Sequence, residues 1–104
     1  MAFGGPIAGF DWDAGNWPKC GKHGVSRAEI EDVLSGTPLV RPDRYPPDTE
    51  ARFDAVGRNG NGRHVFIVFT IRVKNGERFI RPISARYMHQ KEFDHYERQK
   101  GTGA

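Results

Sequence analysis

Hydrophobic residues are concentrated in one central stretch of the chain, residues 63–72, which is followed by a second stretch at residues 77–86. The first stretch is apolar at both alternating positions through its middle, which is typical of a strand buried on both faces. Between the two lies Asn75-Gly76, the preferred two-residue type I′ turn, because both central positions need a positive φ that these residues tolerate. The pattern therefore predicts a β-hairpin.

The turn also predicts which residues of the hairpin face each other. Thr70 faces Arg81, and two pairs further from the turn Val68 faces Ile83. Because side chains alternate along a strand, Thr70, Arg72 and Arg81 share one face of the sheet. The opposite face takes Val65, Ile67, Phe69, Ile71, Ile80 and Ser84. Two guanidinium groups on adjacent strands repel unless an anion or a carboxylate lies between them, so the hairpin is predicted to hold phosphate.

A helix is predicted over residues 27–35. Ser26 is a good N-cap, and Glu29 stands where its carboxylate can reach back to the Ser26 N–H in a capping box. Apolar residues then recur at helical spacing, and Gly36 is a typical stop. This is the most complete helix signal in the chain.

The other segments predict shorter elements and complete the fold. In chain order these are a strand at 10–13, a helix at 15–23 capped by Asn16, an extended segment at 38–47, a strand at 50–56 and a closing helix at 87–100. The expected class is α+β: a small antiparallel sheet of three to four strands, with two N-terminal helices and a C-terminal helix. Glycine-rich ends predict disordered segments at 1–9 and 100–104 around a single domain at 10–99.

Composition narrows the class of protein. A length of 104 residues suits one domain, and a net charge of +3 favours polyanionic partners only mildly. A single cysteine, Cys20, excludes an intramolecular disulfide framework and favours a reducing compartment. No zinc-type Cys/His spacing, membrane-length apolar run or signal peptide is visible. We expect a cytoplasmic protein with no metal, no cofactor and no membrane contact.

Two short motifs in the first half could carry chemistry. Lys22 and His23 stand just before the capped helix, where they could bind phosphate and move a proton, or be a solvated lysine and a histidine bonded to backbone. Glu50 and Arg52 point the same way along a predicted strand. They are either a base beside an organising guanidinium or members of a cross-strand ion pair, which at a surface has little energetic value.

The densest cationic cluster follows the hairpin register. It consists of Arg72, Arg81 and Arg86, with Ser84 between the last two. Arginines on outer strands often only protect a sheet edge. Against that reading, Arg81 occupies a position between Phe79 and Ile83 that the pattern alone would fill with an apolar residue. The cluster therefore remains a candidate for binding phosphate.

Five motifs in this order resemble the BrnT family, over about residues 10–98. They are Phe10-Asp-Trp-Asp13, Lys22-His-Gly-Val-Ser26, Glu50-x-Arg52, Phe69-Thr-Ile-Arg72, and Arg81-Pro-Ile-Ser-Ala-Arg86 leading to a helix with Glu92 and Tyr96. The resemblance implies a RelE-like ribonuclease toxin of a type II toxin–antitoxin pair that inhibits translation. It also implies a BrnA-like antitoxin as partner, with operator DNA bound only through that antitoxin.

The resemblance also implies a set of site residues. Carried over by position, the catalytic candidates are Lys22, His23, Glu50, Arg52, Arg72, Arg81 and Arg86, and Thr70 and Ser84 are candidates for substrate binding. The expected reaction is metal-independent cleavage of RNA by attack of the ribose 2′-OH, with Glu50 or His23 as base. Arg72 and Arg81 would hold the phosphate, and Lys22, Arg52 or Arg86 would supply an acid or further charge. The alternative is a non-catalytic module that binds nucleic acid or an antitoxin.

Overall fold

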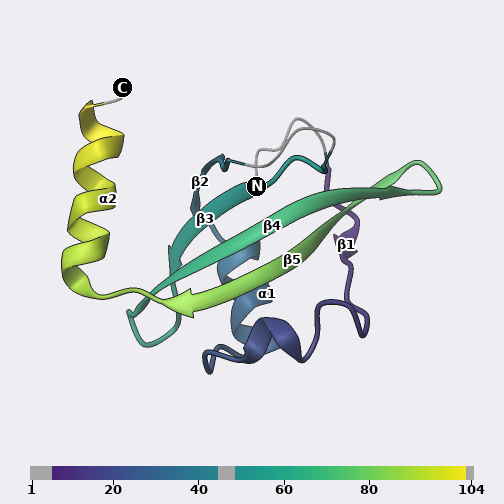
Figure 1. The fold of residues 1–104 in the computed structure, drawn as a ribbon, viewed down its shortest axis with the longest axis horizontal. Coiled ribbons are helices and arrows are strands. Elements are labelled where there is room, and N and C mark those ends of the chain that lie inside the picture. The colour runs from purple at the N-terminus through teal and green to yellow at the C-terminus, as the bar shows by residue number, and fades with distance from the viewer. Residues whose placement is uncertain (1–5, 45–48, 103–104) are drawn as a thin grey trace.

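The computed structural model of the chain describes residues 6–44 and 49–102 (Figure 1). Its elements are β1 (Gly9–Phe10), the short 3₁₀ helix η1 (Lys19–Gly21), α1 (Arg27–Ser35), β2 (Leu39–Pro42), β3 (Phe53–Arg58), β4 (His64–Lys74), β5 (Glu77–Tyr87) and α2 (Gln90–Thr102). Part of the predicted end segments, residues 1–5 and 103–104, lies outside the described residues.

The sheet has five strands in the order β1-β5-β4-β3-β2, so the predicted three- to four-stranded antiparallel sheet is wrong. β1 adds a parallel pair, with Phe10 opposite Ile80, and makes the sheet mixed. At the other edge, β2 pairs antiparallel with β3 from Leu39–Val56 to Pro42–Phe53. Both edge strands are short, and their pairing depends on contacts distant in sequence that local periodicity does not reveal.

The prediction of two N-terminal helices is also wrong, because residues 15–23 form turns and η1 instead of an α-helix. Asn16 does not cap a helix. Its side chain is buried and donates from Nδ2 to the carbonyls of Asp11 and Pro82, each at 2.9 Å. Asn16 thereby holds this segment against β5, and the side chain is no longer available as a cap.

α1 agrees with its prediction in position and start. The Ser26 side chain accepts a hydrogen bond from the Glu29 N–H at 3.1 Å, and Gly36 follows the last helical residue. The second half of the capping box is absent. The Glu29 carboxylate instead accepts the Tyr87 hydroxyl at 2.7 Å, which links α1 to the end of β5.

The central hairpin has the predicted turn and the predicted register near it. Asn75 and Gly76 have φ of 52° and 78°, and Thr70 faces Arg81. Beyond that pair the predicted partnership of Val68 with Ile83 is wrong, because Val68 faces Ser84 and a bulge intervenes.

Pro82 gives a physical reason for the bulge. It pairs with Phe69 next to the irregularity, and proline has no N–H to donate to a ladder, so within sheets it favours edges and bulges. The extra residue reverses the alternation of the side chains beyond it. Ser84 consequently lies on the face of Thr70, opposite to the prediction.

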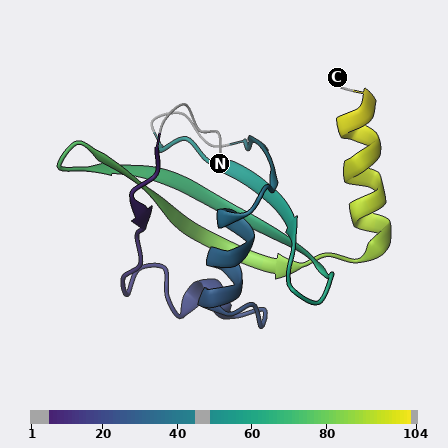
Figure 2. The ribbon, with the colours of Figure 1, turned by 180° about the vertical axis from the view of Figure 1, so that it is seen from behind.

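The two faces of the sheet have different surroundings. α1 covers one face, and its apolar side packs into a core that also contains Val65, Ile67 and Phe69 from β4 (Figure 2). The other face, turned toward the viewer in Figure 1, is not covered by α1. α2 stands at one end of the sheet and contributes to a smaller cluster with Val56, Met88 and Tyr96, as its sequence predicted. No helix within the described residues is both long and apolar enough to cross a bilayer.

Replacing Asn16 tests how the N-terminal segment is held. In Asn16→Ala, the Asp11 and Pro82 carbonyls lose the amide that donates to both of them. We expect the free energy of unfolding to fall by roughly 1–3 kcal/mol, measured by urea denaturation. Asn61→Ala, at an exposed loop position, is the matched control, and an equal loss in both variants would contradict this role.

Candidate active site

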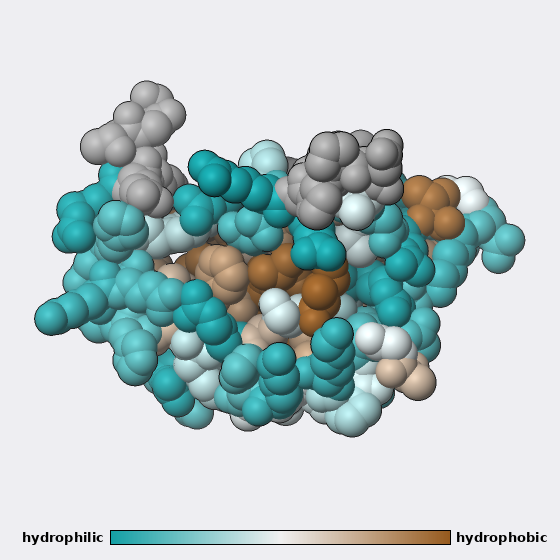
Figure 3. Space-filling model, viewed as in Figure 1, coloured by the Kyte–Doolittle hydropathy of each residue, from teal (hydrophilic) through white to brown (hydrophobic). Residues whose placement is uncertain are grey.

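The face of the sheet that α1 leaves uncovered, here called the open face, collects most of the predicted site residues. The cross-strand pairs on it are Arg72–Phe79, Thr70–Arg81, Val68–Ser84 and Phe66–Arg86 between β4 and β5, and Arg41–Asp54 and Asp54–Val68 toward β2. Figure 3 shows an apolar area in the middle of this face, bordered by hydrophilic side chains. The bulge is what places Ser84 and Arg86 on the same face as Arg72 and Arg81.

Glu50 and Arg72 form a two-point ion pair on the open face. Arg72 donates from Nε to Oε2 at 2.8 Å and from Nη2 to Oε1 at 2.9 Å. This guanidinium holds the pKa of the Glu50 carboxyl below its usual value, and the carboxylate raises the pKa of Arg72. Both side chains remain about half exposed, so an ionised, oriented carboxylate is accessible from solvent.

Arg81 is more enclosed than Arg72 and Arg86, with only 12% of its side chain exposed. It donates to both carboxylate oxygens of Asp13 at 3.0 Å and to Asp11 at 3.3 Å. Lys74 also donates to Asp11, at 2.8 Å. Arg81 therefore ties the N-terminal segment to the hairpin, and its guanidinium lowers the pKa of Asp13.

Arg86 joins the open face to α2. Its two terminal nitrogens donate to the Glu92 carboxylate at 2.9 and 2.6 Å, and its guanidinium carbon lies 4.8 Å from the centre of the Phe66 ring. The ion pair raises the pKa of Arg86 and lowers that of Glu92. The Arg86 side chain is 42% exposed and so remains open to a ligand.

The smaller predicted residues differ in availability. Thr70 is buried and donates its hydroxyl to the Ala51 carbonyl at 2.7 Å, so this group is already engaged. Ser84 and Arg52 are half-buried. Arg52 lies just before β3. Glu50 forms its ion pair with Arg72 on β4 and not with Arg52.

Lys22 and His23 are not brought to the open face. Both are exposed, in the turn between η1 and α1, and α1 packs on the opposite face of the sheet. Their prediction as catalytic residues remains without a geometric link to the arginines.

Asp54 and Arg41 were given no role from sequence, yet they lie opposite each other on the β3 and β2 side of the open face. Asp54 is only 5% exposed, and Arg41 Nε lies 3.5 Å from its Oδ2. Burial, together with the Asp43 carboxyl, raises the pKa of Asp54 to about 6. The sequence placed Asp54 in a strand but gave no sign of its burial.

Neither a metal centre nor a reactive thiol is indicated. Within the described part of the chain, no three His, Cys, Asp or Glu side chains cluster closely enough to hold a metal ion. Cys20 is buried, and burial raises the pKa of its thiol to about 11, which disfavours the nucleophilic thiolate. The open face presents paired carboxylate and guanidinium groups.

Comparison with known proteins agrees with the family resemblance seen in the sequence. A family model described as the ribonuclease toxin, BrnT, of type II toxin–antitoxin systems matches residues 12–92. The match covers α1 and all strands except β1, so it includes the open face. A comparison with curated proteins finds no significant match.

The raised pKa of Asp54 leads to a pH-dependent stability. A carboxyl whose folded-state pKa is about 6, against an ordinary 3.8, favours the folded state when protonated. That stability is present below about pH 4 and is lost as the pH rises through 6. Asp54→Asn cannot titrate, so its stability relative to the natural chain should improve by on the order of 1–3 kcal/mol between pH 4 and pH 8.

Thermal or urea unfolding at the two pH values measures this difference. Asp32→Asn, at an exposed position on α1, is the control and should show no such change. An Asp54→Asn effect that is the same at pH 4 and pH 8 would contradict a raised pKa.

Proposed function

Because this chain belongs to the BrnT family of ribonuclease toxins of type II toxin–antitoxin systems, we propose that its open face cleaves RNA without a metal ion. Family membership implies an RNA substrate and an antitoxin partner. The observation that carries the proposal is the Glu50–Arg72 pair, which presents an oriented carboxylate on a face that also gathers other arginines. Such a face offers a base and positive charge together, the two requirements of this reaction.

In the proposed reaction, the ribose 2′-OH attacks the adjacent phosphorus and Glu50 accepts its proton. The lowered pKa of Glu50 keeps it ionised at neutral pH, so it is in the form that accepts a proton. The products are a 2′,3′-cyclic phosphate and a 5′-OH end. A general base of this kind contributes roughly 10²–10⁴-fold to the rate.

The arginines stabilise the charge that develops on the phosphate. Arg72 has five N–H donors, of which Glu50 engages two, so others remain for a phosphate oxygen. Arg86 is similarly paired and similarly exposed. Arg81 is almost enclosed by Asp11 and Asp13, which supports a role in positioning the hairpin over direct contact with RNA.

The antitoxin is proposed to be a BrnA-like protein, with operator DNA bound through it and not by this chain. The apolar middle of the open face, bordered by paired charges, is compatible with a protein covering the site (Figure 3). A second candidate function is binding of nucleic acid without cleavage. The same arginines would serve it, and its signature is salt-dependent retention of intact RNA.

Glu50→Gln tests the proposed base. The amide keeps a similar shape but cannot accept the 2′-OH proton, so we expect cleavage of a labelled RNA in EDTA to fall by about 10²–10⁴-fold. Gel analysis with mapping of the 2′,3′-cyclic phosphate ends measures both rate and chemistry. The ion pair is exposed, so unfolding should change by no more than about 1 kcal/mol.

Glu77→Gln, exposed at the end of the hairpin turn, is the matched control and should cleave like the natural chain. Full activity in Glu50→Gln would remove Glu50 as base. RNA retained but uncut by the natural chain would favour the binding module.

A further inference from the structure

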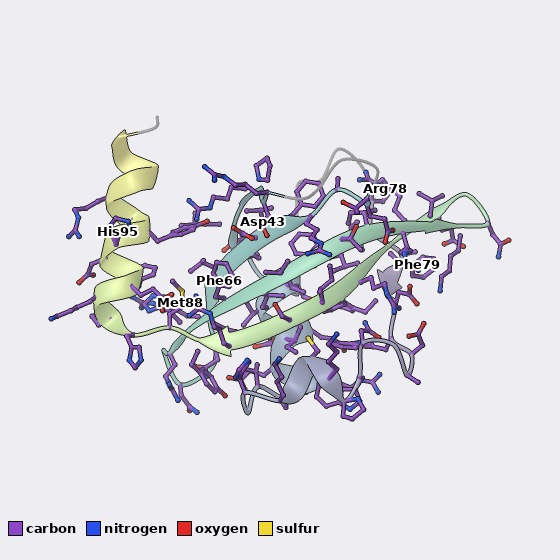
Figure 4. The ribbon with its side chains drawn as sticks, viewed as in Figure 1. Asp43, Phe66, Arg78, Phe79, Met88 and His95 are labelled. Atoms are coloured by element: carbon purple, nitrogen blue, oxygen red, sulfur yellow. The ribbon has the colours of Figure 1, made fainter. Side chains whose placement is uncertain are left out.

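The open face contains one buried carboxyl oxygen that the reaction above does not use. Asp54 Oδ1 is fully buried and has no hydrogen-bond partner within the described residues, and the Asp54 side chain as a whole is only 7% exposed. Asp43 follows β2 directly, its N–H donates to the Arg52 carbonyl just before β3, and its carboxyl is near enough to Asp54 to raise the pKa of that group. Figure 4 shows Asp43 over the β2–β3 side of the open face.

Two ionised carboxylates in contact cannot satisfy each other, because both only accept hydrogen bonds and both are negative. A single proton between them removes both problems, since one carboxyl then donates to the other. This provides a partner for Asp54 Oδ1, whose burial without one would otherwise cost free energy. The geometry therefore favours a shared proton over two separate carboxylates.

The charged groups around the pair do not replace that proton. Arg41 makes a single 3.5 Å contact with Asp54 Oδ2, and its guanidinium also lies 4.4 Å from the centre of the Tyr96 ring on α2. Asp43 Oδ1 accepts a hydrogen bond from the Arg44 N–H at 2.8 Å. One incompletely engaged guanidinium therefore faces two carboxyls.

We propose that Asp43 and Asp54 share one proton, and that this pair is the general acid of the RNA cleavage proposed above, on which this inference rests. Asp43 is half-buried and is the member that meets the substrate. Asp54 is a positioning residue, because it shares the proton from the buried side of the pair. The pair lies on the same face of the sheet as Glu50 and Arg72, and the proposal assigns the acid to the pair and the base to Glu50.

In this step, Glu50 takes the 2′-OH proton while the 2′ oxygen forms its bond to phosphorus. The bond from phosphorus to the 5′ oxygen breaks with its electron pair on that oxygen, which takes the proton from Asp43. Both members of the pair are then ionised. One of them regains a proton from water, and Glu50 releases the proton it accepted to water.

Other groups on the open face are poor acids. Carboxylate partners raise the pKa of Arg72, Arg81 and Arg86, so these guanidinium groups retain their protons. Glu50 is ionised. Among Arg72, Arg81, Arg86, Glu50 and the Asp43–Asp54 pair, the carboxyl pair is the one whose proton is released close to neutral pH.

Carbon-13 NMR titration of the aspartate carboxyls tests the shared proton directly, whether or not the chain cleaves RNA. In the natural chain, one step of the pair should fall near pH 6 and the other well below it, and Asp54→Asn should abolish the high step. Asp32→Asn should leave it in place. Two steps near the ordinary aspartate value, or a stoichiometric Mg²⁺ ion bound by the pair, would overturn the proposal.

The pH–rate profile of RNA cleavage in EDTA tests the acid role. The natural chain should lose rate as the pH rises above about 6, as the pair loses its proton. Asp43→Asn and Asp54→Asn should each lower the rate about 10²–10⁴-fold and remove that fall, with folding checked by circular dichroism. A folded variant whose rate still falls above about pH 6 would overturn the acid role. If the natural chain leaves RNA uncut, the proposed function is overturned, and the shared proton is then tested by the NMR titration alone.

Discussion

The arrangement of the open face depends on the pairing of the hairpin's arginines with carboxylates from outside the hairpin. Arg81 is joined to Asp11 and Asp13, Arg72 to Glu50, and Arg86 to Glu92. These carboxylates belong to the N-terminal segment, the segment before β3, and α2. Each guanidinium therefore connects β4 or β5 to a different part of the chain, while all of them remain on one face. Repulsion between adjacent cations is relieved by this arrangement, which the sheet alone could not provide.

The hairpin and α1 were predictable because their signals are local. Asn75 and Gly76 tolerate a positive φ, and Ser26 provides a hydrogen-bond acceptor within one turn of the helix. Extended structure was predicted at residues 10–13 and 38–47, but the place of β1 and β2 in the sheet was not, since two- and four-residue strands carry almost no periodicity of their own. β1 forms because β5 offers a free edge, and Asn16 then anchors the following segment by hydrogen bonds to carbonyls 5 and 66 residues away.

The candidate site was predictable in residue type but not in partnership. Glu50, Arg72 and Arg81 were singled out from the sequence, yet the carboxylates that hold the two arginines are distant along the chain. The bulge beside Pro82 moved Ser84 to the opposite face from the one that strict alternation predicts. Asp54 was overlooked because its significance comes from burial and from the nearness of Asp43, and neither is visible in a pattern of hydrophobic and polar positions.

The paired arginines also determine how the open face can meet a polyanion. A phosphate that approaches Arg72 uses the donors that Glu50 leaves but competes with Glu50 for the charge of the guanidinium, so binding is weaker than an unpaired arginine would provide. The competition has a chemical advantage. As phosphate oxygens draw on the guanidinium, its hold on Glu50 weakens and the pKa of that carboxyl rises toward its ordinary value. In the proposed reaction, the base thus becomes stronger when the substrate is in place, which would couple binding of the phosphate to removal of the 2′-OH proton. Arg81, which two carboxylates enclose, keeps the hairpin fixed while this exchange takes place.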